Sequence, residues 1–177
     1  SYKLWAKNFL KKFIFNIFFK YPDEIIVNSL YLKKEIDKQF NIKSKCILNP
    51  FDKTRILKSK KSKKNLFGVE KKFLKILFLG RLVDQKDPFT FLKAINKIPQ
   101  IINFKSLIVG SGYMKKDILK FINNNNLKDR LSHIDYTRKA MQYLNQCDLL
   151  VLSSKYEGLP NVLLEAQFLK KYIISTN

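Results

Sequence analysis

Short apolar runs alternate with longer amphipathic stretches from Phe73 to the end of the chain. The apolar runs predict strands at Leu74–Leu79, Phe104–Val109, Ser132–Asp135, Asp148–Leu152 and Tyr172–Ser175. The stretches between them predict helices at Pro88–Ile98, Met114–Asn124, Lys139–Gln146 and Pro160–Lys170. Strands that alternate with helices through short loops indicate an α/β fold, in which a Rossmann-like parallel sheet carries helices on both faces.

The first third of the chain is less regular. Its pattern predicts a helix over Ser1–Lys20, a strand over Glu24–Asn28, a helix that Ser29 caps, and a strand over Lys45–Leu48. Residues 53–72 are crowded with lysines and broken by Gly68, so we expect an exposed linker with short helical pieces.

Polar and glycine-rich loops follow three of the predicted strands. Ligands of parallel sheets bind at the carboxyl ends of the strands, so these loops are the candidate site. They are Gly80 to Lys86, Gly110-Ser111-Gly112, and Ser153 to Gly158. Arg81 and Lys86 share one loop, where an Arg fork and a Lys point charge can hold a diphosphate. Ordinary surface charge is the competing interpretation, and it is stronger for Lys86 because lysine is abundant.

The stretch from Asp148 to Ala166 predicts a buried strand, a tight loop and a helix that starts near Pro160. A helix N-terminus beside a loop of small residues favours anions. Glu157 in the loop and Glu165 in the helix would repel phosphate, so sugar hydroxyls are their obvious ligands. The alternative is an ordinary loop followed by an exposed helical Glu.

Composition adds a strong positive charge. The 177 residues are 46% hydrophobic, enough for a core, and carry a net charge of +21 from 35 basic and 14 acidic residues. This balance favours anionic partners, although a gene rich in A and T also produces abundant Lys, Asn and Ile. Cys46 and Cys147 are isolated and show no metal or redox spacing, so we expect buried reduced thiols in a cytoplasmic protein, and His133 reads as structural.

Three motifs occur in a characteristic order: Gly80-Arg81-Leu82-Val83-Asp84-Gln85-Lys86-Asp87-Pro88, Val109-Gly110-Ser111-Gly112, and Glu157-Gly158-Leu159-Pro160-Asn161-Val162-Leu163-Leu164-Glu165-Ala166. Together they resemble the C-terminal, donor-binding domain of GT-B glycosyltransferases of the family 4 type. The wording of the last motif looks like bacterial transferases that build surface polysaccharides or lipid-linked oligosaccharides. The resemblance implies three regions: residues 1–52 as the end of an N-terminal, acceptor-side domain, 53–72 as the linker, and 73–177 as a truncated nucleotide-sugar-binding domain.

The resemblance also implies roles for residues. Arg81, Lys86 and Glu157 would be catalytic, with the two cations on the donor diphosphate and Glu157 on the donor sugar. The other expected donor-binding residues are Gly80, Gly110, Gly112, Asp135, Gly158, Leu159, Asn161, Val162 and Glu165. Backbone from His133 to Tyr136 would border the base. Members of the family retain anomeric configuration without a metal, and the chain has no Asp-x-Asp motif.

The implied reaction transfers a hexose or N-acetylhexosamine from a nucleotide sugar, with UDP as the expected nucleotide, to a glycan or polyprenyl-linked acceptor. The chain resembles only part of such an enzyme, so we expect donor binding without turnover. The basic aromatic segment from Lys3 to Lys20 suits peripheral contact with the inner face of the plasma membrane, or equally a core helix. The alternative function is that of a non-catalytic basic protein that binds nucleotides or nucleic acid. The dispersed lysines and the lack of a nucleic-acid-binding signature disfavour nucleic acid.

Overall fold

The computed structural model describes residues 9–59, 64–68 and 72–176. The chain divides into two compact units, which we describe separately. The first comprises residues 1–50 and 156–161, and the second comprises residues 51–155 and 162–177.

The second unit is built on a five-stranded parallel sheet with strand order β5-β4-β3-β6-β7. The strands are β3 (Leu74–Leu79), β4 (Phe104–Val109), β5 (Leu131–Ile134), β6 (Leu149–Leu152) and β7 (Tyr172–Ser175). The predicted bounds are confirmed for β3, β4 and β7, and those of β5 and β6 differ by one residue. The Rossmann-like α/β prediction is therefore confirmed.

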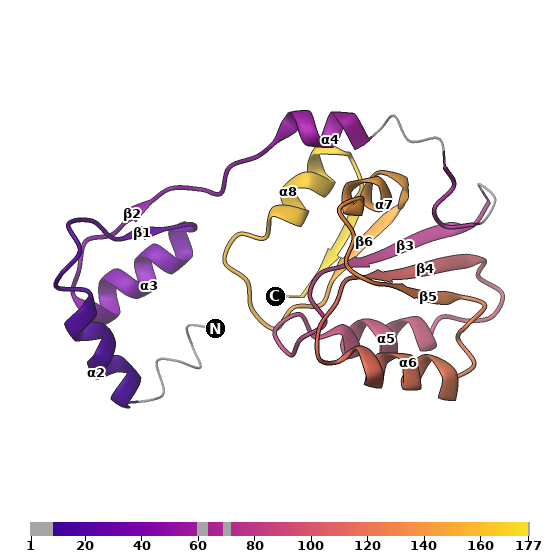
Figure 1. Cartoon of the computed structure of the whole chain (residues 1–177), viewed down its shortest axis with the longest axis horizontal. Helices are drawn as coiled ribbons and strands as arrows, with labels where there is room; N and C mark the ends of the chain where they lie inside the picture. The colour runs from indigo at the N-terminus through magenta and orange to yellow at the C-terminus, as the bar shows by residue number, and fades with distance from the viewer. Residues whose placement is uncertain (1–8, 60–63, 69–71, 177) are drawn as a thin grey trace. The chain divides into compact units, whose positions relative to one another are not determined.

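Helices cover both faces of this sheet (Figure 1). Helices α5 (Pro88–Asn96) and α6 (Lys115–Asn124) lie on one face, and α4 (Lys53–Ser59), α7 (Ala140–Gln146) and α8 (Asn161–Phe168) lie on the other. Alternate residues of β3 supply the two cores: Ile76 and Phe78 pack in the α5–α6 cluster, and Leu77 packs in the other. Asp87 caps α5 by accepting a hydrogen bond from the Thr90 N–H at 3.3 Å, as its position predicted.

The expected exposure of residues 53–72 is wrong at three described positions, of which Ser59 is polar and 7% exposed. Ile56 in α4 and Phe67 are 1% and 2% exposed, and both belong to the core cluster on the α7 face. Gln146 fixes the second of these segments by accepting from the Leu66 N–H at 2.9 Å and donating to the Lys64 carbonyl at 2.6 Å. A single buried apolar side chain anchors each segment to the core. Such an isolated residue is difficult to recognise in a sequence stretch that consists mostly of lysine.

The first unit contains α2 (Phe9–Phe18), β1 (Ile26–Val27), α3 (Leu30–Phe40) and β2 (Lys45–Cys46). The β1 and β2 strands pair in parallel but are shorter than predicted. Ser29 caps α3 by accepting from the Leu32 N–H at 3.1 Å, which confirms the predicted cap. No helix in the described ranges is long and apolar enough to cross a membrane.

One carboxylate organises the end of α3. The Asp37 carboxylate accepts from the Lys33 ammonium at 2.6 Å, the Ser44 hydroxyl at 2.6 Å and the Ser44 N–H at 2.8 Å. These donors, with Lys33 first, lower the pKa of Asp37 to about 2. The network joins the helix to the segment that leads into β2.

Candidate functional site

The loops after β3 and β4 touch backbone to backbone at the carboxyl edge of the sheet. The Gly80 N–H donates to the Val109 carbonyl at 3.1 Å, and the Leu82 N–H donates to the Ser111 carbonyl at 2.9 Å. A Cβ on Gly110, whose φ is +151°, would lie 1.8 Å from the Gly80 carbonyl oxygen. A Cβ on Gly112 would lie 2.2 Å from the Leu82 carbonyl oxygen. The close approach of the two loops therefore requires both glycines.

The loop that carries Arg81 and Lys86 is braced on two sides. On one side, the Asp84 N–H donates to the Tyr113 hydroxyl at 3.0 Å. On the other side, the Ser153 hydroxyl donates to the Lys86 and Asp87 carbonyls at 3.2 and 2.8 Å. These contacts hold the backbone of the cationic loop in place before any ligand binds.

The two cations differ in their surroundings. The Lys86 stem lies beside Gly80, since a Cβ built there would be 3.6 Å from Lys86 Cδ. The Arg81 guanidinium donates to the Gln85 side-chain oxygen at 3.2 Å and is exposed. Its charge is available for a ligand at the edge of the sheet.

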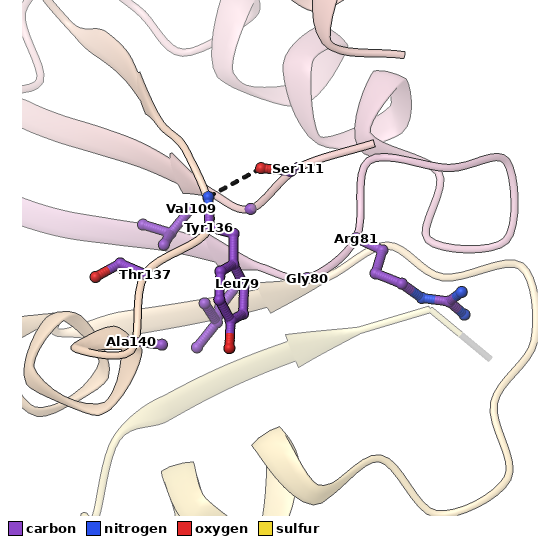
Figure 2. Close-up of a pocket in the computed structure, with 9 residues that line it drawn as sticks. Leu79, Gly80, Arg81, Val109, Ser111, Tyr136, Thr137 and Ala140 are labelled. Carbon is purple, nitrogen blue, oxygen red and sulfur yellow. Dashed lines mark hydrogen bonds between the residues drawn. The ribbon is translucent and has the colours of Figure 1, made fainter. Parts of the chain in front are cut away.

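A cavity of about 360 Å³ opens between the loops after β3, β4 and β5. Its lining residues are Leu79, Gly80, Arg81, Val109, Gly110, Ser111, Tyr136, Thr137 and Ala140. Figure 2 shows that Arg81 extends away from the apolar group around Leu79 and Ala140, so the charge lies at one end. Small-molecule sites occupy this range of volume and combine apolar walls with a few polar groups.

The polar groups beside this cavity are already paired. The Tyr136 N–H donates to the Ser111 hydroxyl at 2.9 Å (Figure 2), which ties the β5 loop to the β4 loop. Lys115 contacts both carboxylate oxygens of Asp135 at 2.7 Å and holds the pKa of Asp135 below its ordinary value. The His133 ring nitrogen lies 2.9 Å from the Gly110 carbonyl oxygen, in accord with a structural role. Asp135 thus supports the wall of the cavity.

The loop after β6 contributes a buried hydroxyl. Ser154 is 4% exposed, and its Oγ is one of two buried side-chain oxygens in the described ranges without a hydrogen-bond partner. An unpaired buried hydroxyl is costly and is commonly satisfied by a ligand or water. Sequence reasoning did not single out Ser154.

The rest of that loop, residues 156–161, belongs to the first unit, where a network of asparagines holds it. The Asn49 amide donates to the Leu159 carbonyl and to the Asn161 side-chain oxygen, both at 2.8 Å. The Asn28 amide donates to the Asn49 side-chain oxygen at 3.3 Å. Glu157 and Gly158 lie in this loop, and a Cβ on Gly158 would be 2.9 Å from the Asn28 side-chain oxygen.

The cavity thus brings together Gly80, Arg81 and Gly110 of the predicted site residues. In the second unit, Lys86 packs beside Gly80, Gly112 lies against Leu82, and Asp135 pairs with Lys115. Val162 and Glu165 lie in α8 and are half-buried. Sequence reasoning expected backbone from His133 to Tyr136 beside the base, but it did not name Thr137 and Ala140, which also line the cavity after β5. The predicted end of that strand at the same edge of the sheet was the available signal. Among the described residues, no three or more His, Cys, Asp or Glu side chains cluster as metal ligands.

Comparison with known proteins identifies the family. Residues 58–177 match the glycosyl transferases group 1 family. The chain belongs to that family. An uncharacterized glycosyltransferase of Methanocaldococcus jannaschii is 29% identical over 92% of the chain and 42% of its own length. A Campylobacter jejuni N-acetylgalactosaminyltransferase, which acts on a diphospho-undecaprenol glycan, is 25% identical over 89% of the chain and 42% of its own length.

Solved structures agree on the fold. Anabaena HepE, crystallised with UDP-glucose, matches with a TM-score of 0.66 at 18% identity, over 86% of this chain and 44% of its own. The parallel sheet with helices on both faces matches GT-B glycosyltransferase structures. The group 1 glycosyltransferase chain described here spans less than half the length of these relatives.

Proposed function

We propose that the chain is the donor-binding part of a retaining glycosyltransferase of the family 4 type. It binds the nucleoside diphosphate of a sugar donor, which we infer to be UDP, in the cavity at the carboxyl edge of the second unit. The observation that carries this proposal is the cavity itself, which has apolar walls from three loops and Arg81 at one end. A base fits the apolar part, and a diphosphate fits the charged end.

We infer the residue roles from the family resemblance of the three motifs together with the lining of the cavity. Arg81 and Lys86 hold the diphosphate and stabilise the charge that develops on the departing nucleotide. Tyr136 and Thr137 border the base. Glu157 accepts from sugar hydroxyls, Glu165 accepts from the ribose, and backbone N–H groups from Gly158 to Val162 assist the phosphates.

The relatives support a lipid-linked or polysaccharide acceptor. The Campylobacter jejuni relative is named for transfer of N-acetylgalactosamine to a diphospho-undecaprenol carrier, and HepE was crystallised with UDP-glucose. We infer a hexose or N-acetylhexosamine donor and an acceptor of this class. Such acceptors favour a protein on the cytoplasmic face of the membrane, with peripheral contact through residues 3–20, of which residues 3–8 lie outside the described ranges.

Calorimetric titration with UDP, GDP, ADP and a short DNA duplex, at low and moderate salt, tests the proposal. We expect saturable one-to-one binding of UDP, weakened roughly ten- to a hundredfold by Arg81→Ala, because a hydrogen bond to a charged group contributes about 1.5–3 kcal/mol. Lys116→Ala removes an exposed charge on α6 away from the cavity lining and serves as the matched control. Salt-dependent DNA binding without nucleotide preference would instead support the basic-protein alternative.

A further inference from the structure

The turn that joins α5 to β4 presents isoleucine to solvent. It lies at the amino-terminal edge of the sheet, opposite to the cavity, at the right of Figure 1. Ile101 is 89% exposed and Ile102 is 43% exposed. The Ile102 N–H donates to the Pro99 carbonyl at 3.2 Å, which closes a tight turn. Turns favour Gly, Asn, Asp and Ser, so turn chemistry does not explain two adjacent isoleucines here.

One arginine holds this turn in shape. The Arg130 guanidinium donates to the carbonyls of Ile98 and Pro99 at 3.0 Å and of Ile102 at 2.9 Å. It also lies 3.9 Å from the centre of the Phe104 ring. Three backbone acceptors of the turn are satisfied by a single side chain. The isoleucines are therefore presented on a preorganised backbone, which reduces the entropy lost on binding.

Basic residues lie at the same edge of the sheet as the turn. Strands β4 and β5 are neighbours, so the segments that lead into them reach the same edge of the sheet. These segments carry Lys97, Lys128 and Arg130 against one acidic residue, Asp129, and Lys105 is the second residue of β4. Lys97 and Lys128 are exposed, and Lys105 donates to the Asp129 carbonyl at 2.9 Å. The result is an apolar tip inside a basic rim, which we name the Ile101 turn.

We propose that the Ile101 turn docks on an anionic lipid bilayer. Its isoleucines would enter the boundary between headgroups and acyl chains, while the lysines around it meet lipid phosphates. Nucleic acid would satisfy the lysines, but it offers no apolar layer for an exposed Ile. This surface belongs wholly to the second unit and is distinct from residues 3–20. It needs no nucleotide, so its test is independent of the proposed glycosyl transfer.

A fluorophore at the tip tests insertion directly. The full chain with Cys46→Ser and Ile101→Cys is labelled with an environment-sensitive dye, since Cys147 is fully buried. With vesicles containing about 30% phosphatidylglycerol, we expect a blue shift and at least threefold protection from an aqueous quencher. The same dye at Lys116→Cys, on α6 near the opposite edge, should show neither effect. No change at position 101, or equal changes at both positions, would overturn the proposal.

Charge variants test the basic rim, and the two pairs of substitutions change the net charge by the same amount. Lys97→Glu with Lys128→Glu should weaken vesicle partitioning at least tenfold as reported by the dye at position 101. Lys116→Glu with Lys139→Glu, both near the opposite edge, should leave that signal unchanged. Equal losses in the two pairs would reduce the effect to overall charge and contradict a docking surface. A single-stranded RNA that produced the same dye response as the vesicles would also refute lipid as the partner.

Discussion

Replacement of Gly110 by alanine measures how far the cavity at the carboxyl edge depends on backbone contact between two loops. The new Cβ would start 1.8 Å from the Gly80 carbonyl oxygen, whereas such contacts are essentially never shorter than 3.0 Å. The loops must therefore separate by about 1 Å, which breaks the Gly80–Val109 and Leu82–Ser111 hydrogen bonds between them. At about 1 kcal/mol per bond, with about 1 kcal/mol for the unfavourable φ, the loss is about 2–4 kcal/mol.

Gly80→Ala is the matched control for stability. The nearest atoms to a Cβ on Gly80 belong to the Lys86 stem, with Cδ at 3.6 Å, which is an ordinary contact. Urea unfolding followed by circular dichroism should therefore show a large loss for Gly110→Ala and a change within about 0.5 kcal/mol for Gly80→Ala. Thermal unfolding should show a fall of roughly 6–12 °C for Gly110→Ala. Equal stabilities of the two variants would refute the steric reasoning.

Three further predictions follow from the same structure. An NMR titration of the Asp37 carboxyl should give a pKa of about 2, and Lys33→Met should raise this pKa. Because the folded-state pKa lies below the ordinary value, the stabilisation from Asp37 is present above pH 4 and is lost as the pH falls towards 2. Burial raises the pKa of Cys147 to about 12, so a thiol reagent at pH 8 should modify Cys46 in the native chain and Cys147 only after unfolding, and equal rates would contradict this. Asn49→Ala removes both amide hydrogen bonds to the 156–161 loop, so proteolysis within that loop should accelerate several-fold, and an unchanged rate would count against the network.

The parts of the fold that the sequence predicted well are those that local chemistry decides. Strand β3 alternates between two cores, and its apolar run alone located both of its ends. Asp87 and Ser29 cap their helices through bonds three residues away, so their roles are visible in a short window. Glycine loops at the ends of parallel strands likewise placed Gly80, Arg81 and Gly110 at the site.

The parts that sequence reasoning missed depend on distant partners. Sequence reasoning did not predict that Lys115, twenty residues earlier in the chain, holds the Asp135 carboxylate, and the donor-binding role of Asp135 stays a prediction. It expected backbone up to Tyr136 beside the base, but not the hydrogen bond from the Tyr136 N–H to Ser111 of a neighbouring loop. Ile56 is a core residue in a lysine-rich segment, and only the folded unit shows that α7 covers it. Contacts between residues that are far apart in the chain produce no periodic pattern that sequence analysis could detect.

Basic residues lie at both edges of the parallel sheet, and we propose a different partner for each edge. At the carboxyl edge, Arg81 stands at the end of a cavity whose volume suits a nucleotide. At the amino edge, lysines surround exposed isoleucines, and no cavity of that kind is needed to meet a bilayer. Both proposed contacts are with phosphate, yet we expect them to respond differently to salt, because lysines at an open surface are screened more strongly than an arginine at a pocket wall. An excess of basic residues can therefore serve a proposed selective site, through Arg81, and a proposed unselective surface, through lysines, within one small domain.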